Sequence, residues 1–383
     1  MRRRLFAQRR NPWLRSHKGL VGVVAVVGVV LALALRSTEP GEQAITEPVD
    51  AGAIDQARVA ALEFLDTYMR DDGRVERTDQ GGDTVSEGQA YAMMLAAGIG
   101  DPVRFQVAWS WAKDNLQRED GLLAWRWDNG AIVDDEPATD ADLDAARALL
   151  VAAERFDEPA YKDEAVRIAD AILAHETVEI GGRSVLLAGP WAQSNQPYVI
   201  NPSYFAPRTF TMLERATGDD RWDQLAKTSR EIVSKFAERA VLVPDWAVIT
   251  TSNEVYATSP PSDPEREVGH SFDGQRTYVR FAEDCDPRGR ALGERAWEFA
   301  RHERRDRIDS VYGLQGEPRG GGEAPSAVVS FAGLAKGQGH DVVVSDLLDR
   351  AREVAQRAPT YYGAAWVALG RMMLTTSLLG DCL

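Results

Sequence analysis

Three short segments of this chain place a carboxylate where a helix is predicted to begin. Glu87 follows Thr84-Val85-Ser86, Asp140 follows Ala138-Thr139, and Asp273 follows His270-Ser271-Phe272. Carboxyl groups supply both a proton donor and a proton acceptor when their surroundings push their pKa values apart. The three segments are therefore candidates for general acid–base chemistry.

Each of these acids also has a simpler explanation. Carboxylates in the first turn of a helix are stabilised by its dipole, and this suits Glu87 and the run Asp140, Asp142 and Asp144. Within that run Asp140 and Asp144 share a helix face, whereas Asp142 does not. Asp273 and Arg276 have the spacing of an ordinary surface ion pair. The run lacks the glycine and the terminal glutamate of a calcium loop, so we expect no metal.

Aromatic residues precede the second acidic segment. Trp125 and Trp127 flank Arg126, which is a candidate partner for an acid. Aromatic faces stack on the apolar faces of sugar rings, and side chains alternate across an extended segment. We therefore expect one tryptophan to face a cleft and the other to pack. Carboxylates and aromatic rings in one cleft favour polysaccharide hydrolysis.

Helical periodicity runs through most of the chain from residue 54 onward. The pattern predicts twelve helices, at residues 54–70, 85–99, 102–117, 140–156, 160–176, 203–217, 219–239, 270–284, 287–301, 325–337, 341–357 and 363–379. Asp101-Pro102 and Asp286-Pro287 combine a capping aspartate with a first-turn proline, and Ser203 is a further cap. Gly98, Gly218 and Gly339 are expected at or near helix ends.

The helix pattern predicts an all-α fold, an (α/α)6 barrel with six inner and six outer helices. Short β pieces are expected only near residues 183–188 and 240–250, and the longer loops at 119–138, 177–202 and 240–269 would border a cleft. A generic helical bundle is the alternative. In a barrel the even-numbered helices run in the same direction, so Glu87, Asp140 and Asp273 would meet at one mouth.

Five strings in order resemble glycoside hydrolase family 8, the bacterial endoglucanase and cellulase family. They are Ser86-Glu87-Gly88-Gln89-Ala90-Tyr91, Ala138-Thr139-Asp140-Ala141-Asp142 with its continuation to Phe156, Asn201-Pro202-Ser203-Tyr204-Phe205-Ala206-Pro207, Val243-Pro244-Asp245-Trp246 and Pro359-Thr360-Tyr361-Tyr362. The resemblance covers residues 65–375. It implies an inverting mechanism, with Glu87 as general acid, Asp273 as general base and Asp140 holding the sugar.

Five further residues are expected to contact the substrate. We expect Trp125, Trp127, Tyr204, Arg276 and Tyr361 to bind a β-linked polysaccharide, and we expect no cofactor. Burial beside aromatic residues, with Asp140 nearby, should raise the pKa of Glu87, and Arg276 should help to keep Asp273 ionised. Phe272 stands where the family often has tyrosine, which removes one hydroxyl near the base. Gly274, where the family often has alanine, is expected to matter little.

The implied activity is endo-hydrolysis of internal β-1,4-glucosidic bonds in a cellulose-like glucan. A chitosanase or mixed-linkage glucanase of the same family is one alternative, and a non-catalytic polysaccharide-binding cell-wall protein is another. The formal charge is −15 overall; the first 36 residues hold eight basic and no acidic side chains, so the remainder carries −23. Such a surface repels phosphate backbones, so no nucleic-acid partner is expected. It leaves a cationic polymer such as chitosan open.

The two cysteines, Cys285 and Cys382, form no metal-binding motif. They would form one disulfide in an oxidising compartment or remain two free thiols.

The first 52 residues are predicted to be a membrane-targeting segment followed by a linker. Residues 1–18 are basic and predicted to be cytoplasmic, residues 19–35 are an apolar signal anchor, and residues 36–52 are a linker to a catalytic domain at 53–383. We expect a single-pass membrane protein with an extracellular catalytic domain, and a monomer. A cleavable signal peptide has the same layout, and the product would then be secreted.

Overall fold

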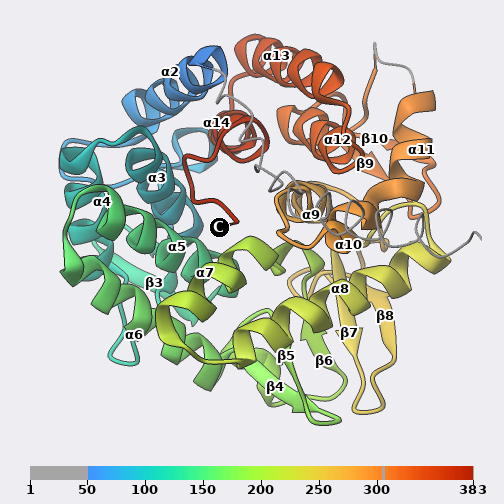
Figure 1. Cartoon of the computed structure of the whole chain (residues 1–383), viewed down its shortest axis with the longest axis horizontal. Coiled ribbons are helices and arrows are strands. Elements are labelled where there is room, and N and C mark those ends of the chain that lie inside the picture. Colours follow the sequence, from blue (N-terminus) through green and yellow to red (C-terminus); the bar gives the residue numbers. More distant parts are fainter. Residues whose placement is uncertain (1–50, 304–306, 383) are drawn as a thin grey trace, which may run out of the picture. The chain divides into compact units, whose positions relative to one another are not determined.

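The computed structural model describes residues 51–303 and 307–382. Among these residues, helices alternate between an inner and an outer ring (Figure 1). The inner ring contains α3 (Ser86–Ile99), α5 (Thr139–Arg155), α7 (Pro207–Thr217), α9 (Phe272–Ala282), α12 (Pro325–Gly337) and α14 (Tyr361–Thr375). The outer ring contains α2 (Ala51–Tyr68), α4 (Pro102–Asn115), α6 (Pro159–His175), α8 (Arg221–Arg239), α11 (Glu294–His302) and α13 (Asp341–Arg357). The sequence-based prediction of an (α/α)6 barrel is therefore confirmed.

The inner helices are composed for burial on all sides. In α3 every residue except Glu87 is buried, and small residues such as Ala96, Ala97 and Gly98 let neighbouring helices approach closely. A Cβ atom at Gly98 would lie 2.3 Å from the Met372 sulfur on α14. Gly98 thus lies near the end of α3, as predicted, but it serves close packing against α14 and is not the left-handed residue. The left-handed residue that ends α3 is Gly100, with φ of 75°.

Helix starts follow the predicted capping chemistry at some positions and depart from it at others. Asp101 caps α4, where its carboxylate accepts the Arg104 N–H at 3.0 Å. Ser203 does not cap α7. It lies in a 3-10 turn, η3 (Pro202–Tyr204), capped by Asn201, and Pro207 then begins the helix.

The helix predicted at residues 287–301 is interrupted. It divides into α10 (Pro287–Arg290), a 3-10 turn η4 (Ala291–Gly293) and α11. Gly289 and Gly293 lie in the interrupted stretch, and glycine weakens a helix because it loses the most backbone entropy on folding.

Short antiparallel strands form within the loops that connect the helices. One sheet joins β1 (Thr84–Val85), β2 (Ala124–Asp128) and β3 (Ala131–Pro137), and another joins β6 (Tyr198–Ile200), β7 (Trp246–Ile249) and β8 (Val255–Thr258). Two-stranded ribbons pair β4 (Thr177–Ile180) with β5 (Arg183–Leu186), and β9 (Val311–Tyr312) with β10 (Pro318–Gly320). The expected β pieces contain β5 and β7. The hairpin of β2 and β3 was predicted as a loop, because β3 is acidic and shows no apolar alternation.

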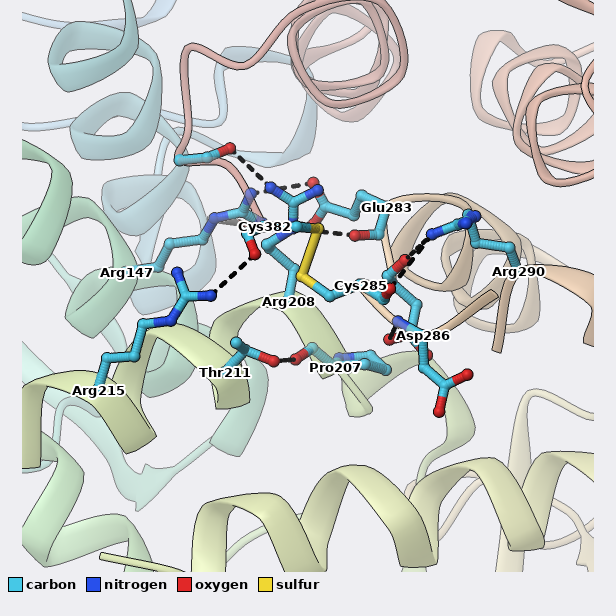
Figure 2. Close-up of a disulfide and its surroundings, with 12 residues drawn as sticks. Arg147, Pro207, Arg208, Thr211, Arg215, Glu283, Cys285, Asp286, Arg290 and Cys382 are labelled. Carbon is cyan, nitrogen blue, oxygen red and sulfur yellow. Dashed lines mark hydrogen bonds and ion pairs between the residues drawn. A yellow bond between two sulfur atoms is a disulfide. The ribbon is translucent and has the colours of Figure 1, made fainter. Parts of the chain in front are cut away.

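Cys285 and Cys382 form a disulfide, the first of the two alternatives that the sequence left open. It joins the end of α9 to the C-terminal segment (Figure 2). Within the described residues, no helix has both the length and the apolarity to cross a bilayer. The predicted anchor at residues 19–35 lies outside them.

Candidate active site

Glu87, Asp140 and Asp273 lie in the first turns of α3, α5 and α9 and meet around one guanidinium group. Arg276 Nη1 donates to Glu87 Oε1 at 2.5 Å and to Asp140 Oδ2 at 2.6 Å. Arg276 Nη2 donates to Asp273 Oδ1 at 2.6 Å. The three N-terminal ends therefore converge at one end of the barrel, as the helix directions predicted.

Arg276 is the centre of this cluster and is not a surface group. Its side chain is 4% exposed, whereas those of Glu87 and Asp273 are 21% and 29% exposed. The Tyr204 ring lies against the guanidinium, 5.5 Å from its central carbon. One buried cation is thus shared by one buried carboxylate and two that reach the solvent.

Glu87 is held from its own helix and from α14. The Tyr91 hydroxyl, one turn further along α3, donates to Glu87 Oε1 at 2.6 Å. Next to Glu87, a Cβ atom at Gly88 would lie 2.2 Å from the Tyr361 hydroxyl. The first turn of α3 therefore rests directly on α14, which fixes where the Glu87 carboxylate points.

Asp273 is oriented by Trp246, the first residue of β7, and by Asp245 just before it. Trp246 Nε1 donates to Asp273 Oδ2 at 3.0 Å. The buried Asp245 carboxylate accepts the backbone N–H groups of Ser271 at 2.6 Å and Gly274 at 2.9 Å, and so caps α9. Each oxygen of Asp273 thus has a partner, Arg276 for one and Trp246 for the other.

Gly274 is closely enclosed, contrary to our expectation that this position matters little. A Cβ atom there would lie 2.6 Å from His270 Nδ1 and 3.0 Å from the Val243 carbonyl oxygen. The His270 ring is itself buried and hydrogen-bonded to that carbonyl at 2.8 Å. Alanine at residue 274 would therefore push against groups that hold the start of α9.

The surroundings shift the pKa values of two of these acids in the same direction. Burial raises the pKa of Asp140 to about 7; Arg276 opposes this rise, and the Glu87 and Asp144 carboxylates add to it. Desolvation also raises the pKa of Asp273, against the effects of Arg276 and Trp246. Arg276 thus lowers the pKa of Asp273, the direction that we expected from the sequence, but the effect of burial is larger.

Two hollows adjoin the cluster. The first, with a volume of about 360 Å³, is lined by Glu87, Asp273, Phe272 and Tyr362 among others. The second, of about 250 Å³, is lined by aromatic side chains and two acids, namely Trp125, Trp191, Tyr204, Trp246, Asp134 and Glu136. Carboxylates thus lie beside an aromatic surface, the combination suited to a polysaccharide.

Comparison with known proteins decides the family. The model of glycosyl hydrolases family 8 matches residues 50–269. The chain belongs to this family. The match ends just before α9, so Asp273 and Arg276 lie beyond the matched segment.

Relatives and solved structures agree with this membership. A probable endoglucanase of Novacetimonas hansenii is 37% identical over 49% of this chain, and endoglucanase A of Acetivibrio thermocellus is 29% identical over 73% of it. The chain spans only 56% and 59% of the length of those two relatives. The structure of an endo-β-1,4-glucanase from Acetobacter xylinum superposes with a TM-score of 0.71 and 26% identity, covering 84% of this chain and 98% of that one.

Within this family 8 barrel the two expected tryptophans point to different sides of β2. Trp125 lines the aromatic hollow. Trp127 packs edge-on against Trp111, 5.3 Å between ring centres, and Arg74 lies over its ring at 5.0 Å. Arg126 donates to the buried Asp83 at 2.6 Å. Trp125 is thus placed to meet a ligand, whereas Trp127 and Arg126 support the wall behind it.

The two expected tyrosines also differ in position. Tyr204 is 8% exposed and lies between Arg276 and Trp246, on the edge of the aromatic hollow. Tyr361 is 1% exposed and packs among Phe64 and Tyr68 of α2. Tyr361 also lines the first hollow beside Glu87, so its ring is a mostly buried part of the cleft wall.

Sequence reasoning missed three residues that organise the site, Tyr91, Asp245 and Trp246. Tyr91 lies four residues after Glu87, and this helical spacing was a usable signal. Asp245 and Trp246 act on residues 26 and 27 positions further along the chain. No local pattern predicts such a pairing, although both residues belong to one of the strings that resemble the family.

Proposed function

We propose that this protein is an inverting, endo-acting glycoside hydrolase that cleaves internal β-1,4-glucosidic bonds in a cellulose-like glucan. The observation that carries the proposal is the convergence of Glu87, Asp140 and Asp273 on Arg276, beside an aromatic hollow. Family membership and the endoglucanase names of the relatives support the choice of substrate.

In this proposal Glu87 is the general acid and Asp273 the general base. Asp273 takes a proton from water while the water oxygen bonds to the anomeric carbon. Glu87 gives its proton to the glycosidic oxygen as the bond to that oxygen breaks. Inversion requires room for the water, which corresponds to carboxyl groups ~6.5–9.5 Å apart. Because Arg276 binds both carboxylates through different nitrogens, it keeps them separated.

Asp140 and Arg276 complete the machinery without exchanging protons with the substrate. Asp140 is nearly buried, and its position beside Glu87 suits a hydrogen bond to the sugar at the cleaved bond. Trp125 and Tyr204 provide faces for the neighbouring sugars. Since substrate binding expels water from these hollows, the charged contacts of Arg276 gain strength as the reaction begins.

A chitosanase is the second candidate, and the charge favours it. The chain carries −15, and Asp134 and Glu136 line the aromatic hollow. Release of reducing ends should be measured on carboxymethyl cellulose, lichenan, xylan and chitosan. Preference for chitosan would replace the proposed substrate. Binding without hydrolysis of any of them would favour the non-catalytic alternative.

The anomer of the first product tests the mechanism. Proton NMR during hydrolysis of a β-linked cello-oligosaccharide should show the α anomer first. An initial β anomer would mean retention through a covalent intermediate. The role given to Asp273 would then be wrong.

A further inference from the structure

Three ion pairs cross the interior between α5 and α9, and only the first borders the cleft. Asp140 pairs with Arg276, Asp144 pairs with Arg280, and Arg147 pairs with Glu283. The members of every pair are separated by 136 positions in sequence. Because steps of three and four residues return to the same helix face, the pairs form a ladder of three rungs.

The third rung is anchored at the far end of the barrel. Arg147 also donates to the Leu379 carbonyl at 3.1 Å, and Arg208 donates to the Glu283 carbonyl at 2.9 Å and the Gly380 carbonyl at 2.8 Å. Figure 2 shows these arginines around the disulfide that ties Cys285 to the C-terminal segment. This end of the ladder is therefore fixed to the chain terminus.

The second rung is closed to solvent and bidentate. Arg280 Nη1 and Nη2 donate to the two oxygens of Asp144 at 2.7 and 2.6 Å, and the side chains are 2% and 1% exposed. The guanidinium carbon lies 5.8 Å from the Trp366 ring. Trp366 in turn meets Tyr91 edge-on, 5.8 Å between ring centres.

The Asp144–Arg280 pair is thus connected to the cluster of acids by two routes, through the helices α5 and α9 and through Trp366. Asp144 lies one turn below Asp140 on α5, and Arg280 lies one turn below Arg276 on α9. Through Trp366 the same rung supports Tyr91, whose hydroxyl donates to Glu87. Three carboxyl groups above it share one guanidinium, so the potential in the cluster depends on whether the rung beneath is neutral.

We propose that Asp144 and Arg280 are a positioning pair for the hydrolysis, which holds Arg276 and Tyr91 against the acids and places no net charge beneath them. This rests on the proposed function. Neither residue touches the cleft, so each acts through its neighbour on the same helix.

Removing one member should change the potential at Glu87 and Asp140 with a definite sign. Asp144→Asn leaves the Arg280 charge uncompensated and favours ionised carboxyl groups above it. Arg280→Gln leaves the Asp144 charge uncompensated and favours their protonated forms. The other titratable or charged groups facing this cluster or the second rung are Arg77, Tyr91, Asp142, Arg147, Glu176, Tyr204, Asp245, Asp273, Arg276, Glu283, Tyr361 and Tyr362. All of them remain in both variants.

The experiment measures kcat and kcat/KM on a neutral cello-oligosaccharide from pH 4 to 9. We expect Asp144→Asn to move the pH profile about half to one unit toward acid, and Arg280→Gln to move it a similar distance toward alkali. The double variant Asp144→Asn/Arg280→Gln should return close to the original profile. Shifts in the same direction, or none, would overturn the proposal.

Two further variants separate positioning from support of the fold. Removal of the third rung, in Arg147→Gln/Glu283→Gln, should lower Tm and leave the pH profile in place. Arg280→Lys keeps the charge but loses the bidentate contact, so kcat should fall about tenfold with the profile and KM unchanged. If the single variants do not fold, Arg280→Lys tests the positioning role by itself. An unchanged kcat in this variant would exclude that role.

A readout without substrate separates this inference from the proposed function. The free energy of unfolding should be measured against pH in the range where Asp140 titrates. Its pH dependence should move toward acid in Asp144→Asn and toward alkali in Arg280→Gln. An inactive protein that shows these shifts would refute the hydrolase function and keep the electrostatic coupling. An active protein that lacks them would refute the coupling alone.

Discussion

At the scale of single residues, the chemistry that we propose depends on one arginine and three carboxyl groups. Arg276 is buried and bound to all three, so it orders them before any substrate arrives. Preorganised charge of this kind costs no rearrangement during the reaction.

Glu87→Gln and Asp273→Asn should each lower kcat by about 10²–10⁴-fold, because each removes a proton-transfer group. Folding should persist, since both side chains lie at helix starts and are partly exposed. Circular dichroism and kcat on a cello-oligosaccharide check this. Asp114→Asn, an exposed acid on α4, is the control and should be neutral. Near-normal activity of Asp273→Asn would move the base to another residue.

Asp140 predicts a pH dependence of stability. Its pKa rises on folding from 3.8 to about 7, so the folded protein binds more protons than the unfolded chain between these values. The free energy of unfolding contributed by this group is therefore largest at low pH and is lost as the pH rises toward 7. Urea unfolding at pH 4–7 should show the decline, and Asp140→Asn should reduce it. Identical slopes in both proteins would contradict the assignment.

At the scale of elements, β2 presents Trp125 and the start of α9 presents Asp273, two of the candidate site residues. Both are held by contacts that the helix pattern does not contain, since β2 pairs with β1 and β3, and α9 is capped from the segment before β7.

Trp125→Ala and Trp127→Ala are a matched pair on β2. Trp125 lines the hollow, so its loss should weaken oligosaccharide binding by about 1–3 kcal/mol and leave Tm nearly unchanged. Trp127 packs on Trp111, so its loss should lower Tm and affect binding less. Calorimetric titration with Glu87→Gln as background and thermal unfolding measure the two effects. Equal effects of both substitutions on binding would show that β2 does not present Trp125 to the ligand.

Gly274→Ala tests the close packing at the start of α9. The added methyl should lower Tm and displace Asp273, with loss of kcat, because it meets His270 and the Val243 carbonyl. Adding His270→Ala should restore part of both quantities, since it removes the nearest of three crowding groups, the other two being the Val243 carbonyl and the Asp245 carboxylate. Additive effects of the two substitutions would mean that they do not meet.

At the scale of the whole molecule, we propose a membrane-tethered protein with an extracellular barrel. The proposal rests on the basic residues 1–18, the apolar residues 19–35 and the disulfide between Cys285 and Cys382. The net charge of −23 beyond residue 36 keeps the barrel away from anionic polymers.

Protease added to intact cells should therefore digest the barrel while residues 1–18 are spared. Antibodies against each part would follow the fragments, and lysed cells are the control. A barrel that is digested only after lysis would overturn the localisation. Release of the barrel into the medium would mean that the apolar segment is cleaved.

Periodicity by itself determined most of the helices and their order, because the 3.6-residue repeat records which face of each helix is buried. Since inner helices run in parallel, it also predicted that Glu87, Asp140 and Asp273 would meet. One of the family strings contains Tyr204, and the three-residue spacing from Asp273 drew attention to Arg276.

The tertiary structure alone decided how these groups are connected. Arg276 binds three carboxylates, Trp246 reaches Asp273, and Gly274 is closely enclosed. Tyr361 packs on α2 and forms a mostly buried part of the cleft wall. All of these contacts join side chains from elements far apart in sequence. Local helix and strand propensities cannot predict such contacts, because the contacts form only when the helices close into a ring. The ladder from Asp140 to Glu283 arises in the same way, from two helices that face each other across the interior.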